Sequence, residues 1–136
     1  MQTLSIQPLT NAVARLQEGW ERYLKDVSDT QIRDGLIQRF EFTYEIAHKI
    51  LKRYLEHASA NPAEIDAMTF QDLIRTANEQ GLLRGDWSDW RQYCDMRSRT
   101  SHTYDEKTVL AVVGGIEQFL AEAVFLRDML NRRLGN

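Results

Sequence analysis

A short segment of the chain brings together side chains that could act on a phosphodiester: Arg97, His102 and Tyr104. An arginine donates two parallel hydrogen bonds to a phosphate and keeps its positive charge at neutral pH. A histidine gains and loses a proton near neutral pH and can therefore transfer one during catalysis. Because no acidic residue lies between Arg97 and Tyr104, the segment predicts a local cationic spot. Three neighbours could add contacts to a phosphate: Ser98, Arg99 and Thr100.

These side chains can share a substrate only if the backbone bends between them. In one continuous helix, Arg97 and His102 would lie about 140° apart around the axis. We therefore expect a helix break near residues 98–101, and locally extended backbone over 101–104 would project His102 and Tyr104 to the same side. The three side chains would then line one small pocket. The alternative is a hydroxyl-rich connection that only caps helix ends.

Metal and cofactor chemistry has little support elsewhere in the chain. Glu45 and His48 have the spacing used in carboxylate-bridged di-iron bundles, but such a site needs a second pair and two more glutamates. We interpret His48 as a surface or partly buried histidine, and His57 as a cation at a helix end. Cys94 is the only cysteine, which excludes an internal disulfide and zinc patterns built on paired cysteines. We expect no metal and no cofactor.

Apolar residues at alternating steps of three and four predict helices along nearly the whole chain. The sequence predicts an all-α, up-and-down four-helix bundle with one additional short helix, as a single domain over residues 1–136. The wide apolar face of the second helix predicts contact with more than one neighbour. The expected helices cover residues 9–25, 32–57, 70–80, 87–97 and 104–133.

Helix ends follow from capping residues. We expect Gly81 to stop the short helix, Glu45 to pair with Lys49 on the helix surface, and Gly114 with Gly115 to mark either close packing or a bend. The expected N-caps are Thr10 or Asn11, Thr69, Asp86 or Ser88, and Thr103 in a capping box with Glu106.

Composition limits the possible partners. With 17 basic and 20 acidic residues the net charge is −3, which argues against binding nucleic acid by charge alone, so any RNA or DNA contact must be local. Residues 1–10 lack the pattern of a signal peptide, and no stretch approaches 18 uninterrupted apolar residues. We expect a cytoplasmic protein with no membrane segment.

The spacing Arg97-x4-His102-x-Tyr104 resembles the motif of HEPN-domain proteins of the HepT type, also called nucleotidyltransferase substrate-binding proteins. Two further blocks support the resemblance: residues 34–45 (DGLIQRFEFTYE) and residues 100–105 (TSHTYD). The similarity extends over most of the chain.

This resemblance implies a helical bundle that forms a homodimer and cleaves RNA, either tRNA or mRNA, without a metal. It also implies a toxin–antitoxin pair in which an MNT-type nucleotidyltransferase, the antitoxin, transfers AMP from ATP to the motif tyrosine. Carried over to this chain, Arg97 and His102 would be catalytic and Tyr104 would accept AMP. A two-fold dimer would place two copies of Arg97 and His102 around one RNA.

Two alternatives belong to other functional classes. The chain could be a non-catalytic module that holds a nucleotidyltransferase or presents a substrate to it, with the motif as a phosphate contact. It could also be a purely structural bundle, which we disfavour because packing does not explain why Arg97, His102 and Tyr104 occur together.

Overall fold

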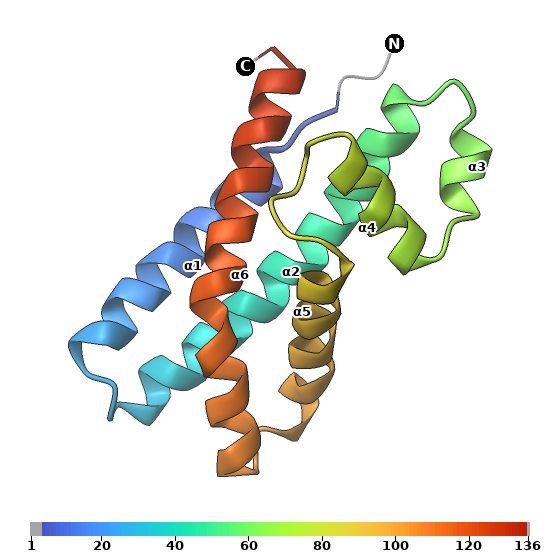
Figure 1. Ribbon diagram of the computed structural model, residues 1–136. Helices are drawn as coiled ribbons and strands as arrows, with labels where there is room; N and C mark the ends of the chain where they lie inside the picture. Colours follow the sequence, from blue (N-terminus) through green and yellow to red (C-terminus); the bar gives the residue numbers. More distant parts are fainter. Residues whose placement is uncertain (1–3, 136) are drawn as a thin grey trace.

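The computed structural model describes residues 4–135 and contains four main helices that run up and down as a bundle (Figure 1). The predicted all-α bundle is confirmed, and no strand occurs in the described residues. The predicted short helix is α4, which lies with the still shorter α3 beside one end of α2 (Figure 1). The helices are α1 (Gln7–Lys25), α2 (Thr30–Ala58), α3 (Pro62–Asp66), α4 (Phe70–Glu79), α5 (Trp87–Arg99) and α6 (Glu106–Arg133).

Within residues 4–135, the five-residue helix α3 is the one α-helix that the sequence pattern does not predict. Pro62 follows the end of α2, as expected, but it also occupies the first turn of α3. A proline is tolerated there because the first turn of a helix leaves its N–H groups unbonded. A helix this short has too few apolar residues to produce a periodic signal, and it buries only Ile65.

Some capping predictions are confirmed and two are wrong. Thr69 caps α4, Asp86 forms a capping box with Asp89, and Gly81 has a φ of 77° just after α4. The prediction of Thr10 or Asn11 at the start of α1 is wrong, because the helix begins at Gln7 with Pro8 in its first turn.

The second capping error lies at the start of α6. The expected Thr103 cap is wrong, because the carboxylate of Asp105 caps the helix and accepts a 3.1 Å hydrogen bond from the Lys107 N–H. An ionised carboxylate at this position also interacts favourably with the positive end of the helix dipole, which a threonine hydroxyl does not.

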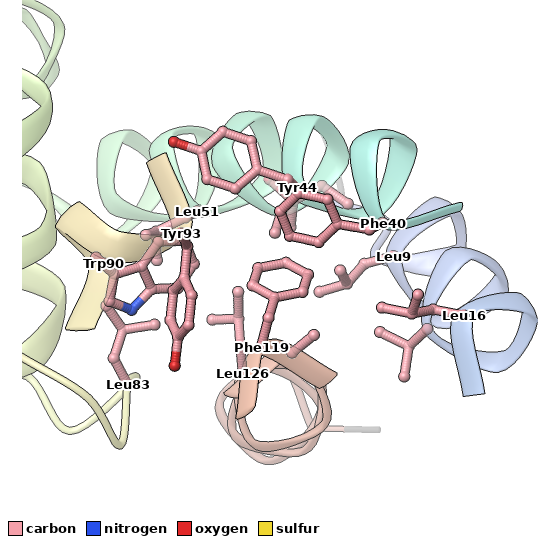
Figure 2. Close-up of a cluster of buried hydrophobic side chains, with 14 of the residues drawn as sticks. Leu9, Leu16, Phe40, Tyr44, Leu51, Leu83, Trp90, Tyr93, Phe119 and Leu126 are labelled. Carbon is pink, nitrogen blue, oxygen red and sulfur yellow. The ribbon is translucent and has the colours of Figure 1, made fainter. Parts of the chain in front are cut away.

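The core lies between α1, α2, α5 and α6, and aromatic rings pack in it beside leucines such as Leu9 and Leu16 of α1 (Figure 2). The ring of Phe119 on α6 lies 5.0 Å from Phe40 on α2 and 5.2 Å from Tyr93 on α5, measured between centroids. Both arrangements are edge-to-face, which aromatic quadrupoles favour. The wide apolar face predicted for α2 is confirmed, because α2 packs against α1, α5 and α6.

Two consecutive glycines in α6 have different environments. A Cβ atom on Gly115 would overlap the side chain of Met96 on α5, whereas a Cβ on Gly114 would meet nothing within 4 Å. Gly115 therefore allows α5 to approach α6 closely, just before Arg97. This resolves the two possibilities left open by the sequence in favour of close packing.

The composition of α6 is strongly apolar. Within residues 4–135 it is the one helix long and apolar enough to cross a membrane, with a mean hydropathy of 1.8 over 18 residues. Half of that window is buried within the bundle, and α6 packs against α1, α2 and α5. Its apolar character fits a central core helix.

Candidate functional site

The candidate site lies at the junction between α5 and α6. The α-helix ends at Arg99 and a 3-10 turn continues over Thr100–His102, so the break falls within the predicted residues 98–101. The backbone beyond it is not extended, because Thr103 has φ −74° and ψ −1°. His102 and Tyr104 still come together, with the Tyr104 Oη 3.4 Å from the His102 Nδ1.

Both members of this pair face solvent. His102 is exposed, and Tyr104 is 86% exposed although it is a large aromatic residue. Their rings meet edge-on at 83°, with centroids 5.9 Å apart. At this exposure the Tyr104 phenol is accessible from solvent.

Arg97 is bound to α2 instead of to the histidine. Its Nη2 donates a short hydrogen bond to Glu45 and lies 3.7 Å from the Glu41 carboxylate. Its Nη1 donates to the Thr100 hydroxyl at 3.0 Å. The hydrogen bond to Glu45 raises the pKa of Arg97 above its usual value. In the part of the chain that the structure describes, no hydrogen bond joins Arg97 to His102 or Tyr104.

The predicted cationic spot is therefore wrong as a property of the folded protomer. Arg97 lies between two carboxylates of α2, and Arg99 pairs with Asp95 at 3.0 Å. The segment contains no acidic residue of its own, but another helix supplies two. Charge counted along the chain cannot include acids contributed by a distant segment.

The remaining candidate phosphate contacts differ in exposure. Ser98 and Arg99 are exposed on the last turn of α5. Thr100 is only 8% exposed, and its hydroxyl accepts a hydrogen bond from Arg97 while donating one to the Arg97 carbonyl at 2.7 Å. Thr100 thus holds the arginine side chain, and its hydroxyl is already engaged within the protomer.

A second ion pair fixes the other end of the junction. Arg33 on α2 makes a bidentate interaction with Glu106, the first residue of α6, at 2.6 and 3.1 Å. The hydrogen bond to Glu106 raises the pKa of Arg33, whose side chain is only 13% exposed. α2 therefore anchors the junction on both sides, at Arg97 and at Glu106.

Sequence reasoning misses Glu41 and Glu45 as parts of this site. The surface pair expected between Glu45 and Lys49 gives way to the contact between Glu45 and Arg97. The available signal was the spacing of Glu41 and Glu45, which places two carboxylates one turn apart on the same face of α2. Two neighbouring like charges on a helix indicate a cationic partner from elsewhere in the fold.

The Glu45 and His48 spacing does not form a metal site. His48 is half-buried, and its ring packs against Phe70 with centroids 4.4 Å apart, while Glu45 contacts α5. Burial lowers the pKa of His48 below its usual value, and the nearby Lys52 lowers it further. Among residues 4–135, no group of three potential metal-ligating side chains is close enough to hold an ion.

Comparison with known proteins gives consistent results. Residues 4–132 match a family described as nucleotidyltransferase substrate binding protein like. A Haemophilus influenzae protein named probable ribonuclease HepT is 46% identical over 107 residues, which make up 79% of this chain and 72% of the relative. A solved H. influenzae structure, described as the fold of a substrate-binding domain of a nucleotidyltransferase, is 36% identical with a TM-score of 0.86. That similarity covers 93% of this chain and 99% of the other.

Proposed function

The chain belongs to the nucleotidyltransferase substrate-binding protein family, and from that premise we propose that it is a metal-independent endoribonuclease. In this proposal it is the toxin of a cytoplasmic toxin–antitoxin pair, and a nucleotidyltransferase partner inactivates it by transferring AMP to Tyr104. The relative named probable ribonuclease HepT supports the ribonuclease activity. The observation that carries the proposal is the junction between α5 and α6, where His102 and Tyr104 are exposed and in contact and Arg97, held by α2, keeps part of its guanidinium side chain accessible.

Cleavage without a metal uses the ribose 2′-hydroxyl as the nucleophile. Its oxygen attacks the adjacent phosphorus while the bond to the 5′-oxygen breaks, and negative charge builds up on the phosphoryl oxygens. Arg97 stabilises that charge through its guanidinium. His102 is exposed and can donate a proton to the departing 5′-oxygen, a step for which placed groups contribute about 10²–10⁴-fold.

A homodimer is part of the proposal, and one face of α6 supports it. Leu110 is 53% exposed in the second turn of α6, and Gly114 lies one turn further with open space around it. An exposed leucine beside a bare glycine allows close approach of a second helix. A two-fold axis there would bring both junctions to one RNA-binding groove. Leu110→Glu should give a monomer in sedimentation experiments and reduced cleavage.

The contact between His102 and Tyr104 suits the proposed modification. The phenol oxygen would attack the α-phosphorus of ATP, pyrophosphate would leave, and the phenol proton could pass to His102, which lies 3.4 Å away. The attached AMP would add bulk and negative charge beside the catalytic histidine. Both effects would exclude RNA, the first by steric overlap and the second by repulsion of the phosphates.

A second candidate function is a non-catalytic module that binds a nucleotidyltransferase or presents a substrate to it. The description of the solved H. influenzae relative as a substrate-binding domain favours it. The carboxylates around Arg97 also weaken phosphate binding by charge alone. The two functions differ in one measurable outcome, which is RNA cleavage by the purified protein.

The test is cleavage of tRNA and mRNA in the presence of a chelator. The wild type should cleave, and His102→Ala and Arg97→Ala should lose about 10²–10⁴-fold in rate with unchanged helicity. His57→Ala is the matched control, because His57 is exposed at the end of α2 and outside the junction. Equal cleavage by wild type and His102→Ala would overturn the proposal.

The modification has a separate test with the nucleotidyltransferase partner and ATP. Tyr104→Phe should still cleave RNA but should resist inactivation, because it lacks the acceptor oxygen. Mass spectrometry of the wild type should place the added AMP on Tyr104. AMP on any other residue would contradict this assignment.

A further inference from the structure

The carboxylate of Glu45 occupies an unusual position for a surface acid, directly against the arginine of the motif. Its hydrogen bond to the Arg97 Nη2 joins two residues 52 positions apart in the sequence. The Glu45 side chain is 47% exposed, so solvent or a substrate can reach it. The 3-10 turn that carries His102 also packs against α2, the helix of Glu45. An acid, an arginine and a histidine therefore surround one junction.

Metal-free cleavage of RNA requires two proton transfers, and the junction of one protomer contains a single histidine. One group must remove the proton of the 2′-hydroxyl, and another must protonate the 5′-oxygen that leaves. The other two histidines are unsuited to the task, because His48 packs against Phe70 and His57 lies in the last turn of α2. Glu45 is the acid that already contacts the phosphate-binding guanidinium.

Arg97 can bind a phosphate without releasing Glu45. A guanidinium has five N–H donors, and the hydrogen bonds to Glu45 and Thr100 use one on each terminal nitrogen. The remaining N–H groups include the Nε–H and one on each terminal nitrogen. With 27% of the Arg97 side chain exposed, a phosphate can approach them. A phosphate bound there would lie beside the Glu45 carboxylate, on the same guanidinium.

We propose that Glu45 is the general base of this site, an inference that rests on the proposed ribonuclease function. As the 2′-oxygen bonds to phosphorus, its proton passes to the Glu45 carboxylate. The bond from phosphorus to the 5′-oxygen breaks, and that oxygen takes a proton from the His102 imidazolium. The products are a 2′,3′-cyclic phosphate and a 5′-hydroxyl. The base and the acid of the reaction are restored when Glu45 loses its proton to water and His102 gains one.

Glu41 provides a matched control for this role. It lies one turn before Glu45 and carries the same charge, but its oxygen is 3.7 Å from the Arg97 Nη2. Its side chain is also less exposed, at 34% against 47% for Glu45. If the acids served only to balance the arginine charge, replacing either one would have similar effects. A proton-transfer role should be specific to Glu45.

The experiment compares Glu45→Gln with Glu41→Gln on an end-labelled single-stranded RNA that the wild type cleaves. Glu45→Gln keeps an oxygen that can accept from Arg97 but cannot take a proton at neutral pH. We expect its kcat to fall about 10²–10⁴-fold with KM little changed, a much larger fall than that of Glu41→Gln. Glu56→Gln, which changes an acid near the far end of α2 and outside the junction, should keep the wild-type kcat. The decline of the wild-type rate towards acid pH should disappear in Glu45→Gln. The wild-type product should end in a 2′,3′-cyclic phosphate.

Thermal melting of each variant checks that the bundle is intact. If Glu45→Gln keeps the wild-type kcat and the same decline of rate towards acid pH, Glu45 is not the general base. If His102→Ala is inactive in the same assay, the proposed ribonuclease function still stands. A second copy of His102 would then be the better candidate for the base. Equal losses of kcat in Glu45→Gln and Glu41→Gln would also overturn the role of Glu45 as base. Such a result would mean that the two acids only balance the charge of Arg97. Absence of cleavage by the wild type would overturn both proposals.

Discussion

Two glutamates contact opposite ends of α5, one of them buried and the other partly exposed. Glu122 on α6 is fully buried and accepts hydrogen bonds from the backbone N–H groups of Arg84 and Gly85, both at 2.9 Å. It also accepts one from the indole of Trp90 at 2.7 Å. Glu45 on α2 is half-exposed and binds a single arginine, Arg97.

The difference separates a structural acid from an accessible one. A buried carboxylate is costly unless each of its acceptors is used, and three short hydrogen bonds compensate Glu122. These bonds fix the loop before α5 and leave no access for a substrate. The pair of Glu45 and Arg97 stays partly hydrated, so its contribution to stability is small. Its groups remain available for other interactions.

The largest effect on stability should come from Glu122→Leu. The substitution leaves the N–H groups of Gly85 and the Trp90 indole buried without an acceptor, each costing about 1–3 kcal/mol, so the free energy of unfolding should fall by at least about 2 kcal/mol. Urea unfolding measures it, and Glu117→Leu, an exposed position on the same helix, is the control. A loss below about 1 kcal/mol would show that Glu122 is not the structural acid that its burial and hydrogen bonds indicate.

Gly115→Ala should have the next largest effect, because the new methyl group would overlap the Met96 Sδ and the end of that side chain must move. Because the methionine side chain is flexible, the cost should be about 1 kcal/mol, at the low end of the range for overpacking. Gly114→Ala, one residue earlier, should instead stabilise the helix by about 0.5–1 kcal/mol when both glycine variants are made in the monomeric Leu110→Glu background, because its Cβ meets open space within the single chain. Thermal unfolding of the two variants should therefore shift in opposite directions, and a shift in the same direction would contradict the close approach of α5.

Arg97→Met should change stability by less than about 1 kcal/mol, although it should abolish RNA cleavage. Methionine keeps much of the apolar stem and removes the charge and the hydrogen bonds to Glu45 and Thr100. Arg99→Met removes the similarly exposed pair with Asp95 and is the control. Denaturant unfolding beside a cleavage assay would separate the two effects. A loss above about 2 kcal/mol would make Arg97 a structural residue like Glu122.

The smallest effect should come from His48, one turn after Glu45 on α2. Because burial lowers the pKa of His48, the unfolded chain binds more protons than the folded one below about pH 6.5. This residue should therefore reduce the free energy of unfolding as the pH falls from about 7 towards 5. His48→Gln should lose less stability over that range than the wild type, as measured by urea unfolding at about pH 7 and about pH 5. Equal losses in the two proteins would contradict the burial of His48.

Local features of the chain were predictable because they depend on residues within one or two turns. The apolar periodicity predicts the four main helices, and the Thr69 and Asp86 caps follow from hydroxyl and carboxylate chemistry at helix starts. The errors at α1 and α6 have the same origin. Several residues near each helix start could cap it, and the tertiary packing selects among them.

The sequence by itself determined that helices form, which faces are apolar, and that an arginine, a histidine and a tyrosine lie at one junction. Only the tertiary structure decided that Glu45 binds Arg97, which lies 52 positions later in the sequence. It also decided that Glu122 accepts hydrogen bonds from the backbone of the loop before α5. Periodicity and capping act between residues a few positions apart. Contacts between distant residues depend on how the helices cross and in which register, which many side chains of the core set together.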